Sequence, residues 1–174
     1  SATFVRNNDS QNKFISLSVS KENIIDNIYF TFDSTSSEGY DFKDAIRLVP
    51  LTRAPRIASM IINEGKALKI NSLPSNYDSV MIFPLQILSL SLDSVGNYIG
   101  IKDSLNLSFN EINLPDGMNV YIHDDYSGFE HSINNIHELS IITDSIGIID
   151  FDLNIGEATM LPRIHKDWPY KNLR

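Results

Sequence analysis

The segment from Asn113 to Ile133 limits the fold more than any other part of the sequence, because it reads as turn, strand, turn and strand. Pro115-Asp116-Gly117 combines a fixed φ, a side chain that can cap its own turn and a residue that accepts a positive φ. The residues from Met118 to His123 then alternate and are rich in β-branched and aromatic side chains. This pattern predicts a β-hairpin.

The same two-residue period recurs along most of the chain. Lys13 to Ser20 alternates, and Ile28 to Phe32 is dense in β-branched and aromatic residues. Further strands are predicted at Ala45 to Val49, Ile57 to Ile62, Ala67 to Ile70, Val80 to Leu92 with a break or bulge near Pro84, Ser104 to Ile112, Val120 to His123, Phe129 to Ile133, Glu138 to Thr143 and Gly147 to Ile155. Turn residues separate these segments.

About ten short strands without a helix of two full turns predict an all-β fold, a two-sheet antiparallel β-sandwich of the jelly-roll or Ig-like kind. The alternation also predicts which side chains share one core. They are Phe14 or Ile15, Leu17, Val19, Ile28, Phe30, Leu48, Ile70, Leu85, Leu107, Val120 and Ile122.

A chain of 174 residues is long enough to bury the core of a single domain. Residues 1–155 are predicted to form the β-sandwich domain, and residues 156–174 a C-terminal strap or linker. Two prolines in this tail, Pro162 and Pro169, oppose an interior strand. Trp168 and Tyr170 could cover the domain or dock a partner.

The composition of the chain limits the kinds of molecule that it is expected to bind. The net charge of -8, from 14 basic and 22 acidic residues, repels phosphate backbones, so nucleic acid is not expected. The chain has no cysteine, which excludes disulfides, thiolate catalysis and cysteine-ligated zinc. No apolar run approaches the roughly 18 residues that span a bilayer, so membrane insertion is not expected.

Acidic residues near the hairpin suggest a metal site as one interpretation. Asp124, Asp125 and Glu130 could offer oxygen ligands to Ca²⁺. The spacing matches no known calcium loop, so a solvated turn is preferred, no cofactor is expected and the protein should stay folded in chelator. Asp41 and Asp44 are interpreted in the same way, as turn caps. The histidines nearby could approach one another for zinc, which we regard as the weaker interpretation; they are His123, His131 and His137.

Three classes of function follow from the residues. The sequence contains neither a nucleophile elbow nor a nucleotide-binding loop, so an enzyme is not expected. The leading hypothesis is a non-catalytic interaction module, and a cryptic hydrolase that uses a pair of the 22 acids is the least favoured one. Between them stands a carbohydrate-binding module that would use exposed rings, for which the candidates are Tyr29, Tyr40, Tyr121, Tyr126 and Trp168.

Short motifs follow one another in a fixed order over about two thirds of the chain. They are Gly39-Tyr40-Asp41, Asp44-Ala45-Ile46-Arg47-Leu48, Ile70-Asn71-Ser72-Leu73-Pro74, Pro84-Leu85, Gly96-Asn97-Tyr98, Leu114-Pro115-Asp116-Gly117, and Val120-Tyr121-Ile122-His123-Asp124 with Ser127-Gly128. In this order they resemble the β-sandwich module of large secreted and cell-surface proteins of Bacteroidota associated with type IX secretion. The segment after Tyr98 is longer than usual, and the tail lacks the glycine-rich strands of the sorting domain.

The resemblance implies an extracellular or cell-surface location and a non-catalytic role in adhesion, assembly or presentation of neighbouring domains. The implied partners are other protein domains or subunits, and also glycans. Four Asp-Ser-aliphatic tripeptides resemble the O-glycosylation acceptor of the same phylum, which would make the chain a glycoprotein. Ordinary turn formation by Asp-Ser is an equal alternative. The serines concerned are Ser79, Ser94, Ser104 and Ser145.

Overall fold

The computed structural model describes residues 13–48, 54–76, 79–123, 130–133 and 138–157. Within these ranges the chain forms twelve strands and no helix, which confirms the all-β prediction. The strands are β1 (Lys13–Lys21), β2 (Ile24–Phe32), β3 (Ala45–Ile46), β4 (Arg56–Asn63), β5 (Lys66–Leu73), β6 (Met81–Leu92), β7 (Tyr98–Gly100), β8 (Ser104–Asn113), β9 (Met118–His123), β10 (Glu130–Ser132), β11 (Glu138–Ile142) and β12 (Ile148–Glu157).

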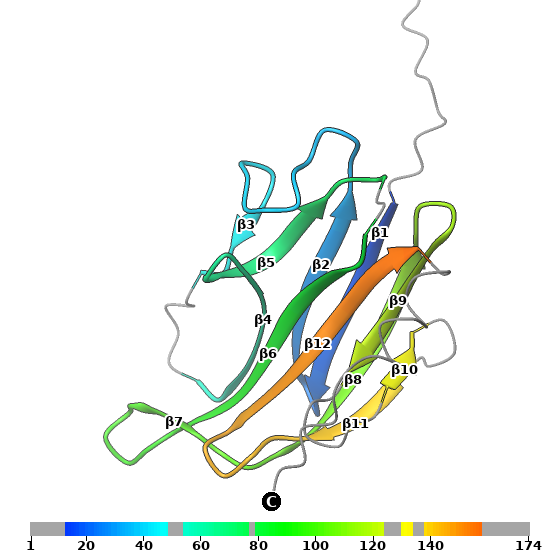
Figure 1. The fold of residues 1–174 in the computed structure, drawn as a ribbon. Coiled ribbons are helices and arrows are strands. Elements are labelled where there is room, and N and C mark those ends of the chain that lie inside the picture. The colour runs from blue at the N-terminus through cyan, green and yellow to red at the C-terminus, as the bar shows by residue number, and fades with distance from the viewer. Residues whose placement is uncertain (1–12, 49–53, 77–78, 124–129, 134–137, 158–174) are drawn as a thin grey trace, which may run out of the picture.

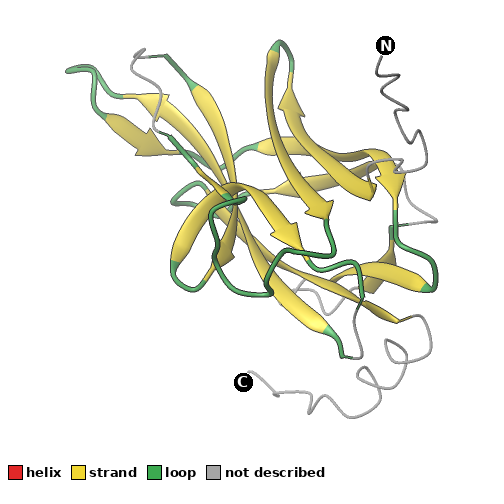
Figure 2. Cartoon of the chain, turned by 90° about the horizontal axis from the view of Figure 1, so that it is seen from above, coloured by secondary structure: helices red, strands yellow, loops and turns green. Residues whose placement is uncertain are grey.

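All the described strands belong to one hydrogen-bonded sheet that curls into a half-barrel (Figures 1 and 2). Its order is β10-β9-β12-β6-β4-β5-β2-β1-β8-β11, with β3 added to β5 and β7 added to β6. The pair β2 and β5 is parallel, whereas the other described pairs are antiparallel. The two-sheet arrangement is not confirmed, because β4 pairs with both β5 and β6 and so keeps the sheet continuous.

The strand bounds agree with the sequence pattern in most places, and the main differences are the following. The strand near residue 45 is cut to Ala45–Ile46, and β7 was not predicted. β6 runs from Met81 to Leu92 through Pro84 without a break. β12 extends to Glu157, so the predicted domain boundary after Ile155 falls inside a strand.

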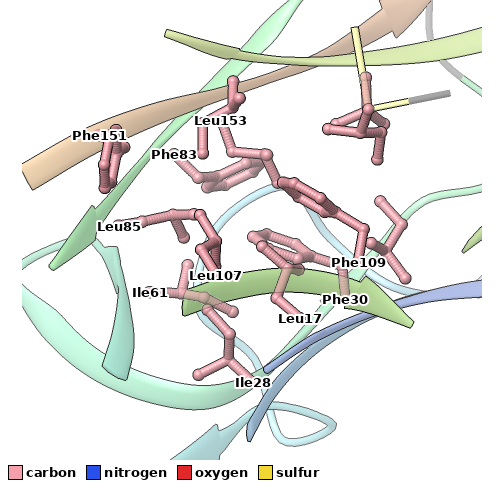
Figure 3. Packing of buried hydrophobic residues seen from close by; sticks show 14 of the residues in the cluster. Leu17, Ile28, Phe30, Ile61, Phe83, Leu85, Leu107, Phe109, Phe151 and Leu153 are labelled. Carbon is pink, nitrogen blue, oxygen red and sulfur yellow. The ribbon is translucent and has the colours of Figure 1, made fainter. Parts of the chain in front are cut away.

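The core lies in the hollow of the curled sheet (Figure 3). Most of the predicted core residues are buried there, namely Ile15, Leu17, Val19, Ile28, Phe30, Leu85, Leu107, Val120 and Ile122. Phe14 and Ile70 are only half-buried. Leu48 was wrongly assigned to the core, since its exposed fraction is 82%. β3 ends two residues earlier, so the alternation that placed Leu48 inward does not continue that far.

Side chains from the two arms of the sheet meet across this core. The rings of Phe30 on β2 and Phe83 on β6 lie 5.7 Å apart between centroids and are tilted by 52°. β2 and β6 are not neighbours in the sheet order, so the ring contact spans the hollow (Figure 3). Aromatic pairs of this geometry contribute beyond the area they bury.

A charged cluster centred on Asp26 lies between β2 and β4. The carboxylate of Asp26 accepts hydrogen bonds from the Ser59 amide at 2.6 Å and hydroxyl at 2.7 Å, from Arg47 at 2.7 Å and from Lys69 at 2.5 Å. Burial pushes the pKa of Asp26 upward, but the hydrogen bonds from Lys69 and Ser59 outweigh it and hold that pKa below its usual value. Asp26 therefore joins β2 to β4 as a carboxylate.

Candidate functional site: a cleft between β4 and β6

A concave site among the described residues lies where β4 and β6 separate. Their ladder ends at the pair Ile61 and Leu85, after which β4 pairs only with β5 and β6 only with β12. The gap is a cleft of about 550 Å³. The residues that line this β4–β6 cleft are Glu38, Gly39, Ile62, Asn63, Glu64, Met81, Ile82, Phe83 and Pro84.

Pro84 explains why the ladder stops. The Ser89 amide donates to Gly147 and the Ser89 carbonyl accepts from Ile101, so odd-numbered residues of β6 turn their main-chain groups toward β12 and β7. Alternation along the strand turns the main-chain groups of Ile82 and Pro84 the other way, toward β4. The next pair of the ladder would join Ile62 to Pro84, which has no N–H to donate.

The opposite wall of the cleft is set by the β4–β5 hairpin. Its two turn residues, Glu64 and Gly65, have φ of 47° and 74°, as a two-residue hairpin turn requires. The flanking pair, Asn63 and Lys66, closes the hairpin, so the main-chain groups of Asn63 face β5. Those of Ile62 consequently face β6, and its amide completes the last pair of the β4–β6 ladder, Ile61 with Leu85. The main-chain groups that remain turned toward the cleft are those of Ile82 on β6.

The loop between β2 and β3 forms one rim of the cleft. The Tyr40 amide donates to the Glu64 carboxylate at 3.3 Å. A Cβ on Gly39 would lie 2.5 Å from the same carboxylate, so only glycine fits without moving Glu64. The loop is braced by Asp44, whose carboxylate accepts the amides of Asp41 at 2.8 Å and Ser72 at 2.6 Å.

Asp41 and Asp44 act as turn caps, as the sequence suggested. The carboxylate of Asp41 accepts the amides of Ser37 at 2.9 Å and Lys43 at 2.7 Å. These two hydrogen bonds hold the pKa of Asp41 below its usual value.

Two amide side chains lie beside the cleft. Asn63, with an exposed fraction of 8%, donates through Nδ2 to the Glu38 carbonyl and to Asn71 Oδ1, both at 3.2 Å. Asn71 is fully buried, and its Nδ2 has no hydrogen-bond partner in the described part of the chain. A buried amide donor without an acceptor is costly, so these residues mark a place where packing alone does not satisfy the polar groups.

The remaining lining side chains divide into an apolar floor and an acidic rim. Met81 and Phe83 are buried core residues, and Ile82 is 40% exposed. Glu38 and Glu64 are exposed and are the two charged residues of the lining. The cleft can therefore offer main-chain hydrogen bonds, an apolar contact and two carboxylates to a ligand.

The side chains of the three predicted calcium ligands lie outside the described residues, so that prediction stays a prediction. Asp124 and Asp125 lie outside those residues, and Glu130 begins β10 but its side chain is outside the described part. His131 pairs with Ile122, so His123, the next residue along, lies on the opposite face of the sheet from His131. Among the described residues no three acidic or histidine side chains group as a metal site would require.

Two of the four Asp-Ser-aliphatic tripeptides form the same turn. The Asp93 carboxylate accepts the amides of Val95 at 2.9 Å and Asn97 at 2.8 Å, and Gly96 has a φ of 84°. The Asp144 carboxylate likewise accepts the amides of Ile146 and Ile148, and Gly147 has a φ of 79°. In both, the glycine amide donates to the aspartate carbonyl at 3.1 Å. Asp-Ser-x-Gly is thus a turn-forming unit here.

The third described tripeptide has a different role. Asp103 accepts hydrogen bonds from Lys21 at 2.6 Å and from the Ser89 hydroxyl at 2.8 Å. Burial pushes its pKa upward, and these two hydrogen bonds outweigh burial and keep the pKa low. In the fourth, Asp78 lies outside the described residues. The four serines that follow these aspartates are all exposed; they are Ser79, Ser94, Ser104 and Ser145.

The predicted aromatic platform is only partly described. Tyr29, Tyr40 and Tyr121 are half-buried. The ring of Tyr40 is covered by the Lys66 ammonium at 4.5 Å from the ring centroid, so one face of that ring is already occupied. Tyr126 and Trp168 lie outside the described residues, and so does Tyr170. The docking role of Trp168 and Tyr170 stays a prediction.

Comparison with protein-family models, with curated protein sequences and with solved structures finds no match to this chain. The site is therefore interpreted from its own geometry.

Proposed function

We propose that this chain is a non-catalytic β-sandwich module of an exported bacterial cell-surface protein, acting in adhesion, assembly or presentation of neighbouring domains. The observation that carries the proposal is the exposure of all four serines in the Asp-Ser-aliphatic tripeptides. Each lies at a turn or strand start, where an O-linked glycan could be attached without displacing a core side chain. An exported and glycosylated protein would need this arrangement.

The packing of the two arms supports the sandwich part of the proposal. Residues of β1 and β2 share one buried cluster with residues of β6 and β12. The two halves of the curled sheet then act as two faces, in the manner of a jelly roll, although β4 and β5 connect them.

The open cleft between β4 and β6 supports an interaction role. Exposed strand edges are ready-made pairing sites, and proteins commonly use them to recognise other chains. The cleft offers such an edge on β6 at Ile82. A module that assembles with or presents other domains would use a surface of this kind.

The test is location and modification in the native host. We expect antibodies to label intact cells, and mass spectrometry to find added mass on peptides that contain the four serines. Ser34 is a matched control, because it is exposed and follows Asp33 but precedes Thr35 instead of an aliphatic residue. Protein found only in the cytoplasm, with all four serines unmodified, would remove the proposal.

A further inference from the structure

We infer that Asp116 is a site of spontaneous covalent modification, where its carboxyl group condenses with the Gly117 amide and the resulting ring opens to isoaspartate. The inference goes beyond the proposed function and does not depend on it. The site lies in the turn between β8 and β9. The bases for the inference are the sequence of that turn, the exposure of its tip and a contrast with other aspartates of the chain.

The reaction needs only the protein and water. The amide nitrogen of Gly117 attacks Cγ of Asp116, the amide hydrogen and the carboxyl hydroxyl group leave as one water molecule, and a five-membered succinimide ring forms. A second water molecule then opens the ring. Attack at Cγ restores aspartate, whereas attack at the main-chain carbonyl carbon leaves a main chain that runs through Cβ and Cγ, which is isoaspartate. Nothing is oxidised or reduced, and the mass of the chain does not change.

The residue after an aspartate decides how easily its nitrogen can attack. A side chain on that residue shields the nitrogen, and glycine has none. Of the eight glycines in the chain, Gly117 is the one that follows an aspartate, and none follows an asparagine. Nothing lies within 4 Å of the position that a Cβ of Gly117 would take. The surroundings therefore leave this nitrogen unshielded as well.

The tip of the turn is exposed to water. The side chain of Asp116 is fully exposed, and the Lys13 ammonium approaches its carboxylate only to 4.0 Å. The hydrogen bond that closes the turn runs from the Met118 amide to the Pro115 carbonyl, at 3.2 Å. This bond uses neither group of the peptide between Asp116 and Gly117. That peptide can therefore rotate to bring the nitrogen beneath the carboxyl carbon when the turn opens.

Other aspartates of the chain also precede a small residue, but their carboxylates are held. Asp93 and Asp144, each followed by serine, accept two main-chain amides of their own turns. Asp103 accepts the amide of the next residue, Ser104, at 2.9 Å, so the group that would attack is already hydrogen-bonded. These carboxylates must give up charge-assisted hydrogen bonds before a ring can close. The structure thus favours reaction at Asp116.

Isoaspartate would alter the start of β9. It adds one methylene group to the main chain and so changes the spacing across the turn. The first pair of β9 with β12 joins Met118 to Glu157. We expect the modified chain to lose this pair, which amide hydrogen exchange at Met118 would detect. Val120 and Ile122 are buried further along β9 and should keep their pairing.

The experiment stores the folded full chain at neutral pH in water enriched in oxygen-18, because opening of a succinimide leaves one heavy oxygen in the product. Digestion after glutamate yields the peptide 112–130, in which fragmentation locates the label. We expect label at Asp116 to accumulate about tenfold faster than at Asp93, Asp103 or Asp144, whose charge-assisted hydrogen bonds oppose ring closure. Methylation by an isoaspartyl methyltransferase with a labelled methyl donor measures the isoaspartate independently.

Two controls separate the effect of the turn from general reactivity. Asp116→Glu keeps the charge but would have to close a six-membered ring, so it should abolish label at this position. An unchanged melting temperature would show that this variant is folded. In the native chain unfolded in urea, label at Asp93, Asp103 and Asp144 should rise, because the hydrogen bonds that hold their carboxylates are lost.

Absence of label at Asp116 in the folded chain would overturn the inference. Equal labelling of Asp116 and the three held aspartates in the folded chain would also overturn it, because the turn would then confer no preference. Label that persists in the same peptide of Asp116→Glu would assign the reaction to another residue. None of these outcomes involves the four exposed serines, so the proposed function is tested separately.

Discussion

At the scale of single residues, Asp26 takes the place of a main-chain ladder. β2 and β5 pair from Tyr29 onward, and β4 meets β5 only from Ile61 onward, which leaves the first halves of β2 and β4 to be joined by a side chain. Asp26 accepts the Ser59 amide and also neutralises Arg47 and Lys69. One carboxylate therefore satisfies groups on or beside β3, β4 and β5.

Replacement of Asp26 by alanine should lower the free energy of unfolding by about 3 kcal/mol, because it leaves two partly buried cations, Arg47 and Lys69, without their carboxylate partner. Urea unfolding followed by circular dichroism measures this. Asp150→Ala is the control, since that exposed aspartate accepts a hydrogen bond from the exposed side of β6, from Gln86 at 3.0 Å, and the change should alter stability by no more than about 0.5 kcal/mol. Equal losses of stability in the two variants would show that the charged cluster around Asp26 stabilises the fold no more than an exposed hydrogen bond does.

The carboxylates of Asp26 and Asp103 should make the stability of the protein sensitive to acid. The pKa values of Asp26 and Asp103 are held below the unfolded value of 3.8, so their stabilisation is present above that pH and is lost as the pH falls through the folded pKa. Urea unfolding at about pH 6 and about pH 3 should show the native chain losing more stability than Asp26→Asn. An identical loss in the variant would assign acid sensitivity to other groups.

At the scale of elements, the turns that begin at Asp93 and Asp144 are stabilised by aspartate and glycine. The Asp144 turn packs tightly against the end of β7. The Asp144 turn rests on the end of β7, where a Cβ on Gly100 would overlap the Ile146 carbonyl. Gly147 is also enclosed, since its Cβ would lie 2.5 Å from the Ser89 carbonyl. The contact between this turn and β7 leaves no room for side chains.

Gly100→Ala should therefore lower stability by about 3 kcal/mol, because the backbone of the Asp144 turn must move. Gly65→Ala provides the comparison. Gly65 has a φ of 74° with nothing within 4 Å of its Cβ position, so that change should cost only about 1 kcal/mol, the strain of the left-handed backbone. Thermal and urea unfolding of both variants measures the two losses of stability. A smaller loss for Gly100→Ala than for Gly65→Ala would contradict the close packing of the Asp144 turn on β7.

Most elements could be predicted from sequence because alternation and turn residues are local signals. β7 was missed, since Tyr98 to Gly100 has too few residues for a period and pairs only because β6 passes beside it. The effect of Pro84 was expected to be a break or bulge in its own strand, whereas the structure places the effect on the neighbouring ladder. A local sequence pattern does not show which strand lies beside another in the sheet.

At the scale of the whole molecule, one core couples the two arms of the sheet. Phe30→Ala should lower the free energy of unfolding by about 4 kcal/mol, because it leaves a cavity between the arms and removes the ring contact with Phe83. Leu48→Ala should change it by no more than about 0.5 kcal/mol, since Leu48 is exposed. Urea unfolding of the two variants tests the corrected core. A large loss at Leu48 would restore the original assignment.

The sequence could not have predicted the cleft, because its lining comes from three separate stretches near residues 38, 63 and 83. Only the sheet order brings them together, and that order depends on which distant strands pair. The turn at Asn63, Glu64 and Gly65 was recognisable. The contact between Glu64 and Gly39, which forms the rim, could not be recognised from the sequence. It requires the loop after β2 to fold back over β4.

The position of β12 in the sheet has a consequence for the order in which the chain can fold. β12 is the last described strand in sequence, yet it lies between β9 and β6 in the interior of the sheet. Until it is synthesised, the hairpin of β9 and β10 has no hydrogen-bonded connection to β6, and the sheet exists as two pieces. Pairing of β12 closes contacts between residues far apart in the chain, which is slow. Until β12 is synthesised, the edges of β6 and β9 that it will pair with stay open to aggregation.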